Sequence, residues 1–352
     1  MHKHNDLRVD ILYFEITDKC NYSCKYCYNR SCISNGEFLH YNAFQRAVEC
    51  FSYLGLKGIT YSGGEPMLHP ELKNFLAFGA KRNLQQLIIT NASMLNEEWC
   101  KYIEKKNILM QLTMDGSSAT LNEYTRGKSA YKTTMAALEL LKRHDLTDRV
   151  MMRCNISFFN MDDIERFVHF ISSYQVRQIE FSLIMSNGRG QEFKCLDRIS
   201  DIGIIQKLDE KIAHIGEREN VRVSLVNSDI SLACPFFGEG NGLRVKIDSA
   251  GSVYPCQALF GKEFALCNIY DVGFDHKLFA DQFRECVRTF ENVCLVEEKC
   301  ARCHYRGLCS KSCIADMIQY KALGMDEQLC AFRKMAYRKD MMKELRKRRG
   351  SN

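Results

Sequence analysis

The strongest constraint on the fold is an alternation of strand-like and helix-like segments over the first half of the chain. In the helix-like segments apolar residues recur with helical spacing, and these segments are 41–54, 70–82, 95–106, 129–143 and 161–173. The strand-like runs, rich in β-branched and apolar residues, are 11–17, 58–62, 87–90, 108–114, 150–159 and 178–184. Strands that alternate with helices predict parallel βαβ units, and six in succession indicate an α/β fold with a partial (β/α)6, TIM-like barrel. In such barrels the functional residues gather where strands end, at the carboxyl face.

Length and charge limit the class of protein. The chain has 352 residues, of which 46% are hydrophobic, so we expect a large domain with a smaller appendage. No apolar stretch approaches the roughly 20 residues of a membrane span, and the first residues, "MHKHNDL", lack the apolar region of a signal peptide. We therefore expect a soluble, cytoplasmic protein without a membrane partner. The net charge of +6 is modest, and the basic run Arg346–Arg349 is expected to be a solvated helix end rather than a nucleic-acid site.

Three cysteines follow the first predicted strand with the spacing C-x3-C-x2-C: Cys20, Cys24 and Cys27. Eighteen cysteines in a large cytosolic chain point to metal binding or redox chemistry rather than disulfides. Three thiolates on a short loop can hold three irons of a cubane cluster and leave the fourth iron open to another ligand. A structural zinc site is the alternative, but it needs a fourth ligand, and Cys32 lies off the pattern.

This loop, with the aromatic residue Tyr26 before its last cysteine, resembles the motif of radical SAM enzymes. The resemblance implies a 4Fe–4S cluster that reduces S-adenosylmethionine (SAM) to a 5'-deoxyadenosyl radical. It extends to the "SGGEP" turn after the second strand, where Gly63 and Gly64 let the backbone approach a ligand and Glu65 can pair with an ammonium group. In the family this turn binds the amino group of the methionine moiety.

Three further positions at strand ends are weaker candidates for the SAM site. Thr113, in "TMDG", matches a family position that contacts the ribose, and Arg126, in "EYTRG", resembles the arginine that holds the SAM carboxylate. Their alternatives are an ordinary strand threonine and a surface arginine. Asn91, in "ITNAS", either lines the same pocket or caps the following turn.

A second zone of cysteines lies near the C-terminus. Cys300, Cys303, Cys309 and Cys313 read C-x2-C-x5-C-x3-C, and Cys330 follows. A zinc ribbon is the alternative for a bare C-x2-C pair. Together with two cysteines upstream, the order resembles the SPASM extension of radical SAM enzymes, which carries two auxiliary 4Fe–4S clusters.

The resemblance also assigns ligands within that extension. It gives the outer cluster Cys300, Cys303, Cys309 and Cys330, and the inner cluster Cys234, Cys256 and Cys313. The interval of sixteen residues between Cys234 and Gly251 is slightly longer than the pattern. For the fourth inner ligand, Cys267 is favoured over Cys286, Cys294 and an open position. The alternative for each lone cysteine is a small buried hydrophobic residue.

The expected domains follow from these motifs. They are the radical SAM partial barrel at 1–190, a helical linker at 191–233, a cysteine-rich iron–sulfur (SPASM) domain at 234–335 and a basic tail at 336–352.

The resemblance implies an oxidoreductase with SAM, three 4Fe–4S clusters and a flavodoxin or ferredoxin as electron donor. The leading hypothesis is modification of a residue in a ribosomally made precursor peptide by a crosslink, a thioether or an oxidation. Anaerobic sulfatase maturases resemble one another in an aspartate base after the cysteine equivalent to Cys256, and this chain has Gln257 there. Sulfatase maturation therefore ranks second among the hypotheses. Modification of a small-molecule or cofactor precursor follows, and a non-catalytic metal protein ranks last.

Two expectations about partners and catalysis complete the sequence-based prediction. The first strand begins near residue 10, so leader recognition is expected to use a separate leader-binding protein or another surface. No residue is identified as the catalytic base.

Overall fold

The computed structural model describes most of the barrel and part of the C-terminal region. The described residues are 7–34, 36–184, 187–193, 202–226, 236, 242–259, 261–293, 298–306, 313–315, 317–318, 327, 330–331, 333–334, 337–338 and 341.

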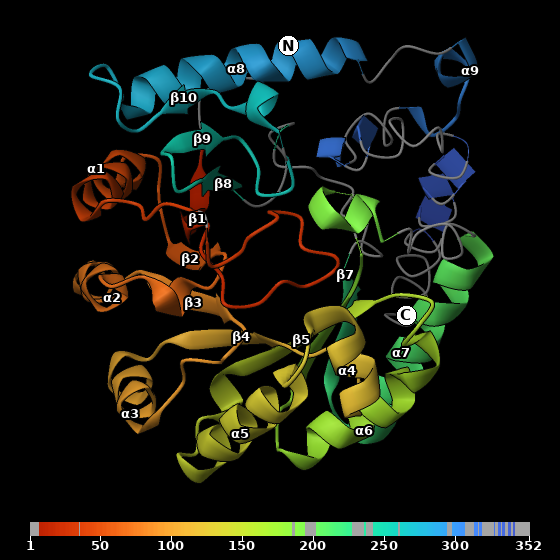
Figure 1. The fold of residues 1–352 in the computed structure, drawn as a ribbon. Helices are drawn as coiled ribbons and strands as arrows, with labels where there is room; N and C mark the ends of the chain where they lie inside the picture. Colours follow the sequence, from red (N-terminus) through yellow and green to blue (C-terminus); the bar gives the residue numbers. More distant parts are fainter. Residues whose placement is uncertain are drawn as a thin grey trace, which may run out of the picture.

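A single curved sheet of ten strands organises these residues (Figure 1). The strands are β1 (Val9–Thr17), β2 (Gly58–Gly63), β3 (Gln85–Thr90), β4 (Leu109–Thr113), β5 (Val150–Ile156), β6 (Gln178–Leu183), β7 (Arg222–Val226), β8 (Leu243–Ile247), β9 (Ser252–Tyr254) and β10 (Cys267–Asn268). Their order is β10-β9-β8-β1-β2-β3-β4-β5-β6-β7, and the pairs from β1 to β7 are all parallel. The predicted α/β fold with a partial barrel is confirmed, and all six predicted strands are present.

The helices lie around the sheet, most of them on its outer side (Figure 1). They are α1 (Tyr41–Ser52), α2 (Leu72–Lys81), α3 (Glu97–Lys106), α4 (Ala119–Arg126), α5 (Ala130–Arg143), α6 (Ile164–Ser173), α7 (Ile202–Glu219), α8 (His276–Val293) and α9 (Glu298–Ala301). Short 3-10 turns are η1 (Pro66–Leu68), η2 (Thr147–Arg149), η3 (Met161–Asp163), η4 (Gly188–Gln191) and η7 (Lys262–Phe264). The five predicted helices correspond to α1, α2, α3, α5 and α6, whereas α4 was not predicted.

The strand β5 is shorter than predicted and ends at Ile156. The backbone N–H of Ser157 donates to the Asn160 side chain at 2.8 Å, so the amide oxygen replaces a ladder partner and starts a turn.

Two segments beyond the six predicted strands also join the sheet. The range expected as a helical linker, 191–233, contains α7 and also β7, which pairs with β6. Within the range expected as the SPASM domain, β8 pairs in parallel with β1. The sheet thus continues across both proposed boundaries.

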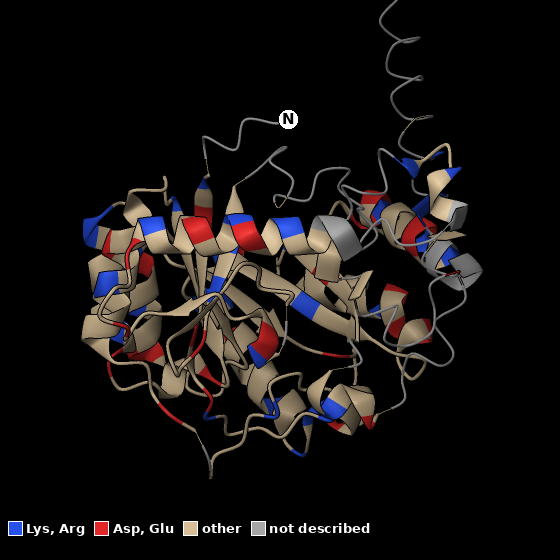
Figure 2. Ribbon diagram, turned by 90° about the horizontal axis from the view of Figure 1, so that it is seen from above, with Lys and Arg blue, Asp and Glu red and all other residues tan. Residues whose placement is uncertain are grey.

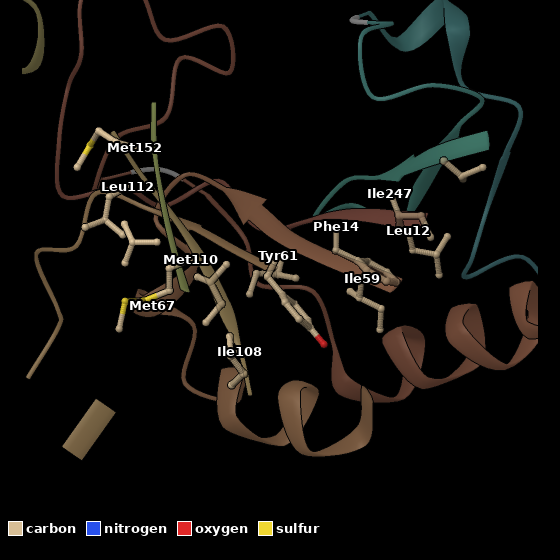
Figure 3. Close-up of a cluster of buried hydrophobic side chains, with 14 of the residues drawn as sticks. Leu12, Phe14, Ile59, Tyr61, Met67, Ile108, Met110, Leu112, Met152 and Ile247 are labelled. Carbon is tan, nitrogen blue, oxygen red and sulfur yellow. The ribbon is translucent and has the colours of Figure 1, made fainter. Parts of the chain in front are cut away.

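The main core lies between the sheet and its helices (Figure 3). Alternate residues of the strands, such as Leu12, Phe14 and Ile59, point to this side and are fully or almost fully buried. Phe44 of α1 and Phe75 of α2 stack there with ring centroids 4.4 Å apart.

The strand residues that alternate with these apolar ones face the interior of the barrel and are more polar. Arg153 of β5 and Glu180 of β6 are register partners that form an ion pair at 2.6 Å, and each side chain keeps 23% exposure. Tyr13 of β1, across the barrel, experiences the charge of Arg153. The interior is therefore a charged, partly solvated space below the carboxyl edge.

Surface charge alternates in sign where it can be followed along α8 (Figure 2). Arg284 pairs with Asp281 and Arg288 with Glu285, each three residues apart. Within the described ranges, no helix combines the length and apolar content needed to cross a bilayer.

Candidate active site

The loop that carries Cys20, Cys24 and Cys27 leaves the carboxyl end of β1 and is fixed by the turn after β2. The backbone N–H of Gly64 donates to the Thr17 carbonyl at 2.7 Å, and that of Glu65 donates to the Lys19 carbonyl at 2.8 Å. A Cβ on Gly63 would lie 2.2 Å from the Thr17 oxygen, and one on Gly64 would lie 2.1 Å from the Lys19 oxygen. Gly63 also has φ +120°, so both glycines are needed for this close backbone approach.

The Glu65 carboxylate is 1% exposed and accepts three hydrogen bonds. The donors are the Met67 N–H at 3.0 Å, the Thr90 hydroxyl at 2.7 Å and the Asn91 N–H at 2.7 Å. Burial raises the pKa of Glu65, and the hydrogen bonds oppose that shift. The carboxylate thus ties the β2 turn to the end of β3.

Asn91 carries this connection on to the cysteine loop. Its Nδ2 donates to the Asn21 Oδ1 at 2.9 Å and lies 3.9 Å from the Cys20 sulfur. Its Oδ1 accepts from the Ser93 N–H at 2.9 Å. The side chain therefore caps its own turn and contacts the cysteine loop, and its predicted place in the SAM pocket stays a prediction.

Arg126, at the end of α4, is buried beside the loop with 5% exposure, so it is not a surface arginine. One terminal N–H donates to the Tyr26 hydroxyl at 3.0 Å, and the guanidinium lies 5.6 Å from the centre of the Tyr22 ring. Burial lowers its pKa, but Tyr26, Cys24 and Asp115 outweigh burial and raise it. Its buried Nε–H has no acceptor among the described residues, so the cation can receive an anionic ligand.

A network below Arg126 holds Tyr26 in place. Asn155, at the end of β5, donates from Nδ2 to the Tyr26 hydroxyl at 3.0 Å. The fully buried Asp115 accepts from the Asn155 N–H at 3.0 Å and from the Thr125 hydroxyl at 2.7 Å. Burial raises the pKa of Tyr26 well above its usual value, so its hydroxyl stays protonated.

Thr113 lies at the end of β4, opposite Arg153 in the register, and is partly exposed. Both side chains point toward the barrel interior, so Thr113 lies on the interior side of the sheet near the site. Its predicted contact with the ribose of SAM stays a prediction.

Arg189, in η4 after β6, holds the backbone of the cysteine loop and was not identified from the sequence. Its Nε donates to the Cys24 carbonyl at 2.8 Å, and both terminal nitrogens lie 3.1 Å from the Ser31 carbonyl. Its own N–H donates to the Cys27 carbonyl at 3.0 Å. The available signal was its position in "SNGRGQ", a polar run directly after a predicted strand.

The chemistry of the three thiols fits an iron–sulfur cluster. Burial raises the pKa of Cys20 to about 12, and the negative charges of Glu65, Cys24 and Cys27 add to it. Burial likewise raises the pKa of Cys24. No three Cys, His, Asp or Glu side chains of the described residues converge at metal-binding distance. A bound cationic centre would favour these thiolates, and the adjacent cation Arg126 suits the anionic part of a ligand.

The C-terminal cysteines are described only in part. Cys234 and Cys309 lie outside the described residues. The six predicted ligands that are described are Cys256, Cys267, Cys300, Cys303, Cys313 and Cys330, and all of them are partly buried. The Cys303 N–H closes a turn onto the Cys300 carbonyl at 3.2 Å, as a C-x2-C pair requires.

Cys267 of β10 lies near α1. It contributes, after burial and Asp275, to the raised pKa of Cys50, which is about 12. Its predicted role as the fourth inner ligand stays a prediction.

The described residues thus place a loop with three cysteines at the carboxyl edge of a partial α/β barrel. Residues 14–171, a little less than half of the chain, match the model of the Radical SAM superfamily.

Similar proteins include a bacteriocin biosynthesis protein and a sulfatase-maturating enzyme. The chain is 23% identical over 310 residues to the antilisterial bacteriocin subtilosin biosynthesis protein AlbA of Bacillus subtilis, covering 84% of this chain and 67% of AlbA. It is 24% identical over 331 residues to a cysteine-type anaerobic sulfatase-maturating enzyme of Clostridium novyi, covering 84% of this chain and 85% of that enzyme.

Solved structures share the fold over nearly the whole chain. The anSMEcpe enzyme with bound AdoMet and the Cp18Cys peptide matches with a TM-score of 0.71 and 18% identity, covering 94% of this chain and 97% of that one. Streptococcus suis SuiB bound to S-adenosylmethionine matches with a TM-score of 0.71 and 16% identity, covering 89% of this chain and 74% of SuiB.

Proposed function

We propose that this enzyme reductively cleaves SAM at a 4Fe–4S cluster held by Cys20, Cys24 and Cys27 and thereby modifies a residue in a ribosomally made peptide. The observation that carries the proposal is the buried Arg126, whose free Nε–H lies beside a loop of three thiols at the carboxyl edge. The similarity to AlbA, over 84% of the chain, supports a peptide as the substrate class.

The chain's own residues have distinct roles in this proposal. When bound at Cys20, Cys24 and Cys27, the cluster and SAM would supply the radical chemistry that removes a hydrogen atom from the substrate. Arg126 binds the carboxylate of SAM through its free N–H, and Thr113 contacts the ribose. Asn91 positions the loop at Cys20.

The turn at Gly63, Gly64 and Glu65 binds the amino group of SAM in this proposal. We assign that contact to backbone carbonyls of the turn, because the Glu65 carboxylate already accepts three hydrogen bonds from the protein. Glu65 then acts as a positioning residue.

Two auxiliary 4Fe–4S clusters complete the proposed enzyme. The outer cluster would use Cys300, Cys303, Cys309 and Cys330, and the inner one Cys234, Cys256 and Cys313, with Cys267 as a candidate fourth ligand. Iron, acid-labile sulfide and zinc per chain test this after reconstitution without oxygen. Three clusters predict about twelve irons with matching sulfide. Roughly four irons, with zinc making up the rest, would instead make the C-terminal zone a zinc module.

The remaining parts of the proposal concern partners and location. We expect a flavodoxin or ferredoxin as the electron donor, a separate leader-binding protein and a cytoplasmic location, since low-potential clusters and free thiols require reducing conditions.

Sulfatase maturation is the second candidate. The similarity to the cysteine-type anaerobic sulfatase-maturating enzyme, over 84% of this chain, supports this candidate. Gln257 argues against it, because an amide cannot serve as the base that an aspartate supplies in those enzymes. A small-molecule precursor ranks third.

Co-expression tests the substrate class directly. The chain would be expressed with each short peptide encoded beside its gene and, separately, with a sulfatase peptide that contains cysteine or serine. A mass change in a neighbouring peptide, lost with Cys24→Ala, is expected. Formylglycine in the sulfatase peptide would replace the first candidate with the second, and no change in any peptide would favour a small molecule.

A further inference from the structure

Four aromatic side chains form a cluster at the carboxyl edge, which we call the aromatic platform: Tyr124, Phe158, Phe159 and Phe193. The rings of Tyr124 and Phe159 stack with centroids 3.7 Å apart and an interplanar angle of 8°. Phe193 lies 5.9 Å from Tyr124, and Phe158 lies 6.2 Å from Phe159. Phe158 and Phe159 are 39% and 37% exposed, so the platform presents apolar area to the surroundings.

A cation stands over this platform. The Lys25 ammonium lies 3.7 Å from the centre of the Tyr124 ring and 6.0 Å from that of Phe193. Lys25 is an exposed residue for which the structure describes no ion pair. The surface therefore combines flat aromatic faces with one positive charge.

Every part of the platform is bound to the candidate active site. The Lys25 N–H donates to the Thr125 carbonyl at 2.8 Å, which joins the cysteine loop to the helix of Tyr124. The Phe193 N–H donates to the carbonyl of Arg189, the residue that holds the loop at Cys24.

The two remaining rings are connected through the same strand. Phe158 and Phe159 follow β5, whose Asn155 donates to Tyr26. The platform is thus a fixed extension of the site rather than a separate patch, and its position at the carboxyl edge is where a substrate reaches the barrel interior.

We propose that the aromatic platform binds an aromatic or large apolar side chain of the substrate peptide, with an acidic neighbour held by Lys25. This inference rests on the proposed function for its occupant. Exposed aromatic faces that continue from a reaction centre favour a flat or apolar side chain, and the single cation favours a carboxylate beside it. The platform then sets which residues may flank the modified one.

Selection from a displayed library of random linear peptides tests the proposal without turnover. The library is applied without oxygen to the full reconstituted chain in the presence of SAM. The wild-type chain is expected to enrich aromatic and large apolar residues next to Asp or Glu. Phe159→Ala is expected to weaken binding of the enriched peptides by about tenfold, the size of a lost aromatic contact with its buried area.

Charge reversal supplies a readout that misfolding cannot imitate. Lys25→Glu is expected to replace Asp and Glu by Lys and Arg in the enriched peptides while the aromatic preference remains. The matched controls are Lys81→Glu on α2 and Tyr53→Ala after α1, both exposed and on the outer side of the barrel. Their selections are expected to equal that of the wild-type chain.

Three outcomes would overturn the platform: no aromatic enrichment by the wild-type chain, an unchanged acidic preference with Lys25→Glu, or a lower melting temperature of Phe159→Ala with unchanged selection. The last would mean that the platform packs against this chain itself. Aromatic selection without formation of 5'-deoxyadenosine would refute the proposed function but not the role of the platform. Formation of 5'-deoxyadenosine without aromatic selection would refute the role of the platform but not the proposed function.

Discussion

Replacing Glu65 with glutamine distinguishes two roles of its carboxylate: holding the protein together and pairing with the ammonium group of SAM. In the structure the carboxylate holds the protein together, since its Oε1 accepts from Met67 and Thr90 and its Oε2 accepts from Asn91. A glutamine amide keeps one acceptor oxygen and places an NH2 group at the other position. If the oxygen stays with Met67 and Thr90, the amide nitrogen faces the N–H of Asn91, and both are donors.

The size of the effect follows from this geometry. The site is 1% exposed, so water cannot replace the missing acceptor. A buried donor left without a partner costs about 1–3 kcal/mol, and we expect Glu65→Gln to lower the unfolding free energy of the cluster-free protein by that amount. The SAM affinity of the reconstituted protein should fall as well, because the backbone of Asn91, whose side chain contacts the cysteine loop, loses its bond to residue 65.

Urea denaturation followed by circular dichroism, on cluster-free protein, measures the first effect. Glu98→Gln is the matched control, because Glu98 is exposed and pairs with Lys73 at the surface, and its midpoint should equal that of the wild-type chain. A Glu65→Gln variant as stable as the wild-type chain, but with weaker SAM binding, would refute the reasoning. That result would assign the carboxylate to the ammonium of SAM.

Three further predictions concern the site and the fold. Arg126→Gln should weaken SAM binding about ten- to a hundredfold in equilibrium dialysis, the range of one charge-assisted hydrogen bond, and equal binding would remove Arg126 from the site. Burial lowers the pKa of His69 below its ordinary 6.5, so the unfolded chain takes up a proton first as the pH falls. The contribution of neutral His69 to the unfolding free energy should therefore be at its maximum above pH 6.5 and should decline as the pH falls toward the folded-state pKa. His69→Phe should abolish this decline in urea titrations. A decline that persists would be assigned to another group. Phe44→Ala should lower the unfolding free energy by about 3–5 kcal/mol, since it removes a fully buried ring from the stack between α1 and α2, and a loss below about 1 kcal/mol would mean that the core relaxes into the space.

The strands were predictable because buried parallel strands are nearly continuous apolar runs. The strand β7 lacks that signal: its sequence, "RVSLV", is short and begins with a charged residue, and its pairing with β6 makes it a strand. The helix α4 has eight residues, too few for a clear period, although the Ser118 side chain caps it by accepting from the Leu121 N–H.

Some residues of the site are also indicated by local sequence patterns, whereas others are brought together only by the fold. Cysteine spacing and the Gly-Gly-Glu turn are local patterns that can be recognised from the sequence. The bond from Arg189 to the Cys24 carbonyl joins residues 165 positions apart, and that from Asn155 to Tyr26 joins residues 129 apart. No local pattern indicates such pairs, because the topology of the sheet brings them together.

The most direct test of the account is the amount of 5'-deoxyadenosine formed from SAM by the anaerobically reconstituted chain with a low-potential reductant. Cys100→Ala is the matched control, because Cys100 is a buried cysteine of α3 in the outer helical layer. We predict formation by the wild-type chain and by Cys100→Ala, and none by Cys24→Ala. Formation that persists in Cys24→Ala would contradict the assignment of the reaction to the three-thiol loop.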